Sequence, residues 1–153
     1  MEDILPFRRM IDYGLEAIMP AHVVYDSTTP DLAGFSRFWL QDILRGQLGF
    51  QCVIFSDDLT MAAADTAGDY PDRASAALDA GCDMVLVCNN RDGAVQVLDE
   101  LSNHEDPTSQ MRLVRMHGRH EVTRNEIHMD PRWKTAVSAI AEYDESPSLS
   151  LDI

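Results

Sequence analysis

Three short apolar runs that alternate with helical patterns constrain the fold of this chain more than any other feature. The runs cover residues 15–19, 52–55 and 83–88, and the second and third are nearly continuous in Val, Ile, Leu and Phe. Such runs are typical of parallel strands that are covered on both faces. Because a helical pattern separates each run from the next, the sequence predicts an α/β fold with a parallel sheet and right-handed crossovers.

The helical patterns between the runs carry start and stop signals. Polar N-caps and Pro favour the first turn of a helix, and Gly is typical of the position after the last turn. The predicted helices are 7–13 before Gly14, 38–45 with Ser36 as N-cap and Gly49 as stop, 71–80 between Pro71 and Gly81, and 94–101 with Asp92 as N-cap.

The character of the sequence changes after residue 101. A polar connector over 102–109 precedes helical patterns over 111–116 and 133–143, and the last residues are rich in Ser and Asp. We therefore expect strand–helix units over 1–101, a linker with a helical tail over 102–143, and a disordered end over 144–153.

Net charge limits the partners of this chain. The formal charge is −14, and affinity for nucleic acid or an anionic membrane depends on Lys and Arg that neutralise phosphates. We therefore expect no nucleic-acid partner and no membrane partner.

The chain shows no signal-peptide pattern, and its cysteines, Cys52, Cys82 and Cys88, are odd in number and lie in or beside apolar runs. These features favour buried thiols in the reducing cytoplasm.

Polar residues follow each predicted strand. His22 comes after the first, Asp57 and Asp58 after the second, and Asn89 and Asn90 after the third. Ligands of parallel α/β folds bind beyond the carboxyl ends of the strands, so these positions predict the functional site. The alternatives are structural: a strand-end Asp often caps a helix, a lone His is often hydrogen-bonded in the core, and paired Asn residues often order a turn.

Asp57 and Asp58 are adjacent, which argues against a carboxylate pair. Successive side chains of a strand point to opposite faces, so only one of the two carboxylates is expected to face a reacting centre. Periodicity alone does not say which one. The sequence contains no Gly-rich phosphate loop, nucleophile elbow or zinc signature, and we expect no metal site.

The same strand-end segments resemble the bacterial β-N-acetylglucosaminidases of glycoside hydrolase family three, the peptidoglycan-recycling type. The most specific matches are Phe-Ser-Asp-Asp-Leu at 55–59 and Ala-Gly-Cys-Asp-Met at 80–84, and a further match is Met-Pro-Ala-His at 19–22. The resemblance spans nearly all of 2–101 and continues more loosely to Trp133. It implies the C-terminal part of a (β/α)₈ TIM barrel, with strands six to eight and their helices, followed by a short helical tail.

The resemblance also implies a chemistry. It assigns the nucleophile of a retaining glycosidase to Asp57, and substrate binding or support of the site to His22, Asp58 and Met61. The parent enzyme would remove terminal non-reducing N-acetylglucosamine from 1,6-anhydro-muropeptides, as a monomer and without a cofactor. Its substrate would be a muropeptide or another N-acetylglucosaminide.

One part of the family pattern is missing from these residues. The His-Asp acid/base loop and the Lys-His-Phe-Pro-Gly segment of the family do not occur here. We therefore expect a truncated chain or a fragment, with background activity when it is assayed alone. The alternative expectation is a non-catalytic half-barrel that binds sugar or a partner through the open edge of its sheet.

Overall fold

A computed structural model of the chain describes residues 2–101, 104–119 and 122–145. The chain divides into two compact units, Met1–His117 and Gly118–Ile153, which are described separately. Of the end predicted to be disordered, 144–153, the first two residues belong to a helix, and 146–153 lie outside the described residues.

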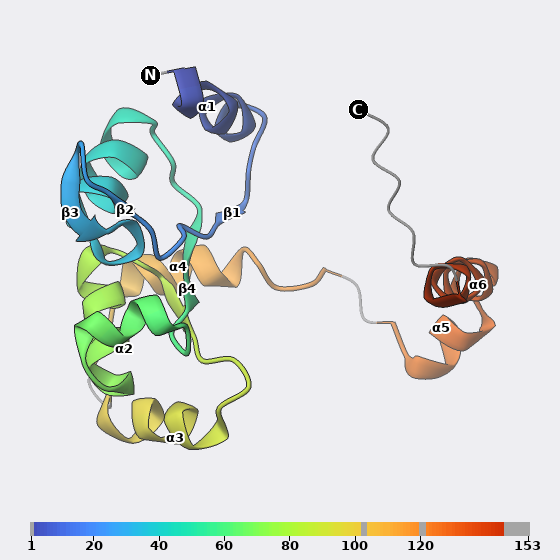
Figure 1. Cartoon of the computed structure of the whole chain (residues 1–153). Helices are drawn as coiled ribbons and strands as arrows, with labels where there is room; N and C mark the ends of the chain where they lie inside the picture. The colour runs from blue at the N-terminus through green and yellow to red at the C-terminus, as the bar shows by residue number, and fades with distance from the viewer. Residues whose placement is uncertain (1, 102–103, 120–121, 146–153) are drawn as a thin grey trace. The chain divides into compact units, whose positions relative to one another are not determined.

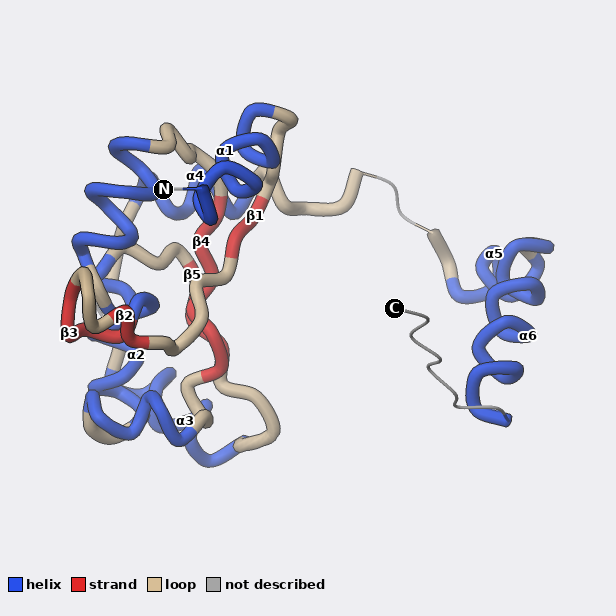
Figure 2. Tube along the Cα trace, turned by 45° about the horizontal axis from the view of Figure 1, so that its top comes forward, coloured by secondary structure: helices blue, strands red, loops and turns tan. Residues whose placement is uncertain are grey.

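A three-stranded parallel sheet forms the centre of the first unit (Figures 1 and 2). Its strands are β1 (Ala17–Ile18), β4 (Val53–Asp58) and β5 (Met84–Leu86), in the order β1-β4-β5. Ala17 aligns with Val53, and Phe55 aligns with Met84. The prediction of an α/β fold with a parallel sheet is confirmed, and each strand coincides with one apolar run of the sequence.

Helices connect these strands in chain order. A 3₁₀ turn (Glu2–Ile4) and α1 (Leu5–Asp12) precede β1, a π-helix (Phe38–Gln47) and α2 (Tyr70–Ala80) flank β4, and α3 (Arg91–Glu100) and α4 (Pro107–Val114) follow β5. In the π-helix, backbone N–H groups donate five residues back, as from Leu48 to Ile43 at 2.8 Å. The helices predicted from the sequence are all present within a few residues of their expected bounds.

Besides the 3₁₀ turn Glu2–Ile4, a hairpin and two further 3₁₀ turns of the first unit lie outside the predictions. An antiparallel hairpin joins β2 (Val24–Tyr25) to β3 (Thr29–Leu32), and 3₁₀ turns cover Ala33–Phe35 and Ala62–Ala67. The hairpin follows β1 directly and pairs with an irregular register. Its strands are short, and β3 contains Pro30, so the sequence offers no alternating pattern that would reveal it.

Two of the predicted helix caps are wrong. The Ser36 side chain does not cap the π-helix: its buried hydroxyl has no hydrogen-bond partner among the described residues, although the Ser36 carbonyl accepts from the N–H of Leu40 at 3.0 Å. Asp92 lies inside α3, whose N-cap is Asn90: the Asn90 side-chain oxygen accepts from the N–H of Gly93 at 2.9 Å. A cap must leave the helical backbone region, and Asn90 does so with φ −133° and ψ 92°.

The π-helix and α2 cover one face of the sheet and build its main core. This core combines side chains of the π-helix, β4, α2 and the adjoining connections, namely Leu40, Leu44, Phe50, Ile54, Ala77, Ala80 and Cys82. A second cluster, formed by Leu59, Ala74 and Val97, joins α2 and α3 beyond the end of β4. Burial of apolar area in these clusters stabilises the sheet against the helices at roughly 25 cal/mol per Å². Both clusters therefore hold the end of β4, where Asp57 lies, in a fixed place.

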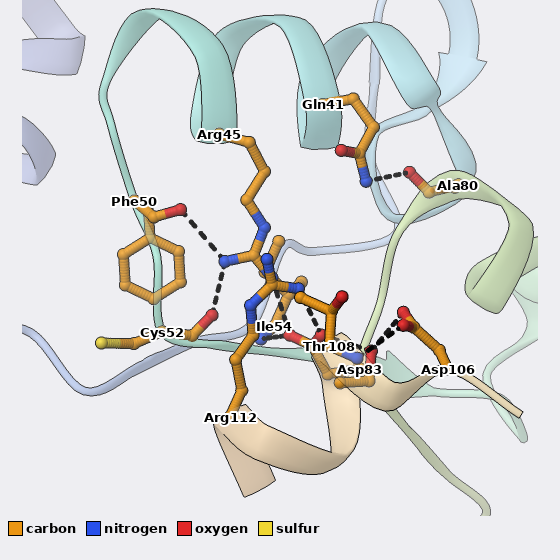
Figure 3. A network of polar contacts seen from close by, with 11 residues as sticks. Gln41, Arg45, Phe50, Cys52, Ile54, Ala80, Asp83, Asp106, Thr108 and Arg112 are labelled. Atoms are coloured by element: carbon orange, nitrogen blue, oxygen red, sulfur yellow. Dashed lines mark hydrogen bonds and ion pairs between the residues drawn. The ribbon is translucent and has the colours of Figure 1, made fainter. Parts of the chain in front are cut away.

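A buried carboxylate fixes α4 to the opposite end of the sheet (Figure 3). Asp83 precedes β5, and its fully buried side chain accepts hydrogen bonds from Arg45 (2.7 Å), the Ile54 N–H (2.8 Å), Ser109 (2.6 Å) and Arg112 (2.8 Å). Burial by itself would raise the pKa of Asp83, but these hydrogen bonds outweigh it and the pKa lies below its usual value. The Asp83 network thus joins the π-helix, β4, β5 and α4.

The second unit consists of α5 (Arg124–Met129) and α6 (Pro131–Glu145). Thr123 and Glu126 form a reciprocal capping box at the start of α5, which the sequence reading did not predict. α6 begins at Pro131, two residues before the predicted range 133–143, and the Asp130 carboxylate accepts from the N–H of Arg132 at 2.9 Å.

All three cysteines are free thiols. Only Cys82 is fully buried, and this burial raises its pKa to about 12. Cys52 and Cys88 are half-buried, so the expectation of buried thiols holds in full only for Cys82.

Among the described residues, none of the helices combines the length and apolar character that a membrane span requires.

The start of α2 provides a test of local stability. Asp69 accepts from the N–H of Asp72 at 3.1 Å, and Asp72 accepts from the N–H of Asp69 at 3.4 Å. Asp69→Ala should lower the free energy of unfolding by about 1 kcal/mol, because it leaves a helical N–H without its acceptor. Urea denaturation measures this change. Asp69→Asn and Asp79→Ala, the latter exposed near the end of the same helix, should each stay within about 0.5 kcal/mol. An equal loss in Asp79→Ala would contradict the assignment of the cap.

Candidate active site

Asp57 and Asp58 are the last two residues of β4. Beyond them the chain continues to pair with β5, because the N–H of Leu59 donates to the carbonyl of Leu86 at 2.8 Å. The register between β4 and β5 shifts between Phe55 and Asp58. Within this irregularity the buried Ser56 hydroxyl accepts from the N–H of Leu86 at 2.9 Å. Both carboxylates therefore start from a well-anchored strand end.

The Asp58 carboxylate is occupied by hydrogen bonds to the protein. It accepts from the Thr60 N–H at 2.9 Å, the Thr60 hydroxyl at 2.6 Å and the Cys88 N–H at 3.0 Å. Burial would raise the pKa of Asp58, but the hydrogen bonds from Thr60 and Cys88 outweigh this and lower it. Asp58 thereby ties the turn after β4 to the end of β5, as a loop-ordering residue does.

The Asp57 carboxylate is far less engaged. It accepts one hydrogen bond, from the N–H of Asp58 at 2.9 Å, and no ion pair of the described residues includes it. Its side chain is half-buried. A carboxylate can accept about four hydrogen bonds, so Asp57 keeps most of its capacity for a ligand.

His22 lies close to both aspartates, as its position after the first strand predicts. The side chain is 6% exposed, and its ring is 4.7 Å from that of Phe35, measured between centroids. Neither ring nitrogen has a hydrogen-bond partner among the described residues. Burial lowers the pKa of His22, although the charges of Asp57 and Asp58 act in the opposite direction. A buried imidazole of lowered pKa is neutral near pH 7 and can donate from one nitrogen and accept at the other.

Gly34 leaves room for this imidazole. A Cβ atom at position 34 would lie 3.1 Å from Nδ1 of His22 and 3.3 Å from its Cε1 atom. Any larger residue at this position would crowd the ring. The close approach of Gly34 to His22 was not predicted from the sequence, because it depends on the unexpected 3₁₀ turn Ala33–Phe35.

Met61 lies in the turn that follows the aspartates. Its N–H donates to the Asp58 carbonyl at 3.1 Å, its carbonyl accepts from the Ala64 N–H at 2.9 Å, and its side chain is 42% exposed. Asn89 and Asn90 order the next connection: Asn89 has φ +57°, and Asn90 caps α3. The structural interpretation of this pair is therefore correct for Asn90.

The structure thus brings His22 near Asp57 and Asp58, and it places Met61 three residues after Asp58, in the turn that follows β4. Sequence reasoning missed the supporting residues Ser56 and Thr60. Thr60 carries a signal in retrospect, because Asp-x-Thr is a common turn-forming pattern. Within the described ranges, no group of three or more His, Cys, Asp or Glu side chains could hold a metal ion.

Comparison with known proteins places these residues in a family. The model of the "Glycosyl hydrolase family 3 N terminal domain" matches residues 1–116. A β-hexosaminidase of Thioalkalivibrio sulfidiphilus is 56% identical over 151 residues, which cover 99% of this chain and 44% of the relative. A β-hexosaminidase of Tolumonas auensis is 63% identical over 102 residues, which cover 66% of this chain and 30% of the relative.

Solved structures agree with this assignment. NagZ from Neisseria gonorrhoeae, in a complex with N-trifluoroacetyl-D-glucosamine, superposes with a TM-score of 0.72 at 38% identity. The match covers 92% of this chain and 41% of that structure. The chain therefore spans less than half the length of these relatives.

The family match corrects one expectation. We expected the C-terminal part of the enzyme, whereas the matching model describes the N-terminal domain of the family, to which residues 1–116 therefore belong. The match takes in the whole parallel sheet, with α1, the π-helix, α2 and α3. On this evidence, the chain belongs to glycosyl hydrolase family 3.

Proposed function

We propose that this chain forms part of a retaining β-N-acetylglucosaminidase in which Asp57 is the nucleophile. The observation that carries the proposal is the contrast between the two adjacent carboxylates. Asp58 accepts three hydrogen bonds from Thr60 and Cys88, whereas Asp57 accepts one, from the neighbouring N–H. A nucleophile needs lone pairs that are free to attack, and Asp57 has them.

The proposed reaction follows the retaining course. An Asp57 oxygen attacks the anomeric carbon of the sugar, and the bond from that carbon to the leaving-group oxygen breaks. The leaving oxygen takes a proton from an acid that lies outside the residues of this chain. Water then attacks the anomeric carbon of the glycosyl ester and gives its proton to the same external group, now a base, which releases the sugar with retained configuration and frees the Asp57 carboxylate. This course needs no metal or organic cofactor.

The proposed substrate is a terminal β-linked N-acetylglucosamine. Support comes from the gonococcal NagZ structure, which holds an N-acylated glucosamine. We extend the proposal to 1,6-anhydro-muropeptides, to a monomeric parent enzyme and to a cytoplasmic location, as the sequence resemblance implies. His22, neutral and close to Asp57, and Met61, exposed in the adjoining turn, are the proposed substrate-binding or supporting residues.

We also propose that the sheet is part of a (β/α)₈ barrel, comprising strands six to eight. Among the described residues, β1 pairs on one side only, with β4. A cavity of about 610 Å³ lies beside β1, lined by Ile18 of that strand, by Met19 directly after it and by apolar residues of α1 and the π-helix. An unpaired parallel strand beside an apolar cavity is what remains when a neighbouring strand and helix of a barrel are absent.

The same open edge supports the second candidate, a non-catalytic module that binds sugar or a partner. Measuring N-acetylglucosamine binding and turnover on the same sample separates the two candidates. Binding without turnover, both in this chain and in a protein that restores the remainder of the relatives, would favour the module.

An activity comparison tests the first candidate. We define the chimera as this chain joined to the part of the Thioalkalivibrio β-hexosaminidase that lies outside the matched region. On a chromogenic β-N-acetylglucosaminide, the chain alone should give background turnover, because it lacks the acid that is worth about 10²–10⁴-fold. The chimera should be active. Robust Asp57-dependent hydrolysis by the chain alone, or a folded but inactive chimera, would contradict the proposal.

A further inference from the structure

The loop between β4 and α2 follows Asp57 and Asp58 directly and carries Met61. We call residues 59–68 the β4–α2 loop. Its first residue, Leu59, is fully buried in the cluster with Ala74 and Val97, and its last residue, Gly68, is exposed. Between these ends the loop contains Thr60, Met61 and the short 3₁₀ turn Ala62–Ala67. Any restraint on this loop therefore acts on the surroundings of Asp57.

Arg73 of α2 bonds to the loop at its start, middle and end. Its NH1 donates to the Leu59 carbonyl at 2.8 Å, and its Nε donates to the Gly68 carbonyl at 2.8 Å. Its NH2 pairs with the Asp65 carboxylate at 2.9 Å. All three nitrogens of one guanidinium are thus used on a single loop, and the Arg73 side chain is only 12% exposed.

The guanidinium is itself held in place. Its carbon atom lies 4.8 Å from the centroid of the Tyr70 ring, and the Tyr70 hydroxyl accepts from the Asn90 side-chain amide at 2.8 Å. Asn90 caps α3 beyond the end of β5. Arg73 and Tyr70 therefore link the connections that follow β4 and β5, which both lie at the carboxyl end of the sheet.

The backbone conformation at Gly68 restricts the end of the β4–α2 loop. Gly68 has φ +111°, and a Cβ there would lie 2.4 Å from the Asp72 carboxylate. Only glycine adopts this conformation readily, and it directs the chain into the cap at Asp69. The Gly68 carbonyl is consequently presented to Arg73 by a backbone that cannot easily rearrange.

We propose that Arg73 is a positioning residue of the candidate active site, which holds the β4–α2 loop and with it Met61 over the end of β4. The planar guanidinium of arginine has donors in fixed directions and can bond to three acceptors on one loop. The ammonium group of lysine is a compact point charge and cannot reach all three. Arg73→Lys therefore does not replace the native residue. For its effect on substrate, this inference rests on the function proposed above.

Hydrogen exchange on the present chain tests the restraint without any need for activity. Arg73→Met should raise amide exchange in residues 60–68 by about tenfold or more, while amides of β4 and the π-helix keep their protection. Arg73→Lys should give most of the same increase. Asp65→Ala should give little, because its exposed ion pair contributes little.

Arg37→Met is the matched control. It removes another arginine of the same unit, which donates to the Asp79 carbonyl at 2.8 Å near the far end of α2. Exchange in 60–68 should be unchanged in this variant. Unchanged exchange of 60–68 in Arg73→Met, or a uniform rise across the whole first unit, would overturn the proposal.

Kinetics of the chimera test the link to the substrate. Loss of loop position should raise KM on the order of tenfold with kcat nearly unchanged, because Asp57 stays on its anchored strand. A variant that merely unfolds in part would show the reverse, a lower apparent kcat at constant KM, and that result would overturn the positioning role. An inactive chimera would refute the proposed function, and the exchange data would still decide whether Arg73 restrains the loop.

Discussion

Asp57→Ala in the chimera should lower kcat for β-N-acetylglucosaminide hydrolysis by about 10⁴-fold or more, the scale seen when a nucleophile is removed. The reason is that the covalent course depends on one carboxylate, and no other free acceptor replaces it: Asp58 is committed to Thr60 and Cys88. Steady-state assays with a chromogenic substrate measure the loss. The folded state should be nearly unaffected, since Asp57 accepts only the N–H of Asp58.

Asp58→Ala is the matched control for this prediction. It removes a carboxylate from the adjacent position and frees the turn after β4, so it should reduce activity by less than Asp57→Ala while lowering stability by more. Thermal unfolding of both variants separates the two effects. Equal losses of kcat with equal stabilities would contradict the assignment of a single nucleophile.

Asp83→Ala should destabilise the chain by about 3–5 kcal/mol, the cost of breaking a buried ion pair from one side. Without Asp83, the Arg45 guanidinium, whose side chain is 9% exposed, loses its carboxylate, and Arg112 and Ser109 of α4 lose their anchor. Urea denaturation gives the free energy. Exchange in 107–114 should rise even under conditions where the sheet stays folded, because α4 is the element that Asp83 secures.

The stability of the network should also depend on pH. The pKa of Asp83 is lowered in the folded chain, so its contribution is present above the unfolded pKa of about 4 and is lost as pH falls through the folded value. Asp83→Asn should flatten this part of the stability profile. Arg112→Ala should cost less than Asp83→Ala, since Arg45, Ile54 and Ser109 still serve the carboxylate. A loss below about 1 kcal/mol in Asp83→Ala would contradict the structural role of the network.

Local sequence signals predicted the framework of the fold well. Each apolar run became a strand, and each helical pattern became a helix, because periodicity reports directly on burial. Errors arose where a choice depended on backbone geometry. Ser36 and Asp92 are both good N-cap residues by type, yet the Ser36 hydroxyl makes no cap hydrogen bond among the described residues, and α3 is capped by Asn90. The hairpin of β2 and β3 gave no pattern at all.

The sequence predicted where the candidate site lies, at the carboxyl ends of the strands, but only some of the contacts within it. Strand alternation indicated that Asp57 and Asp58 have different surroundings, but the donors that occupy Asp58 include the N–H of Cys88, thirty residues away. Contacts of this kind depend on the register between β4 and β5, which is irregular here. The Asp83 network and the contacts of Arg73 are likewise set by packing between distant elements. The resemblance to a family, and not the spacing of residues, singled out Asp57.

Trapping the covalent intermediate tests the central claim most directly. A 5-fluoro-N-acetyl-β-glucosaminyl fluoride donates its sugar to a nucleophile and then slows hydrolysis of the glycosyl ester, so the chimera should accumulate a labelled enzyme. Peptide mapping by mass spectrometry should find the added sugar on Asp57, in the segment Phe-Ser-Asp-Asp-Leu. A sugar attached to Asp58 or to any other residue, or steady turnover with no trapped ester, would contradict the assignment of Asp57 as the nucleophile.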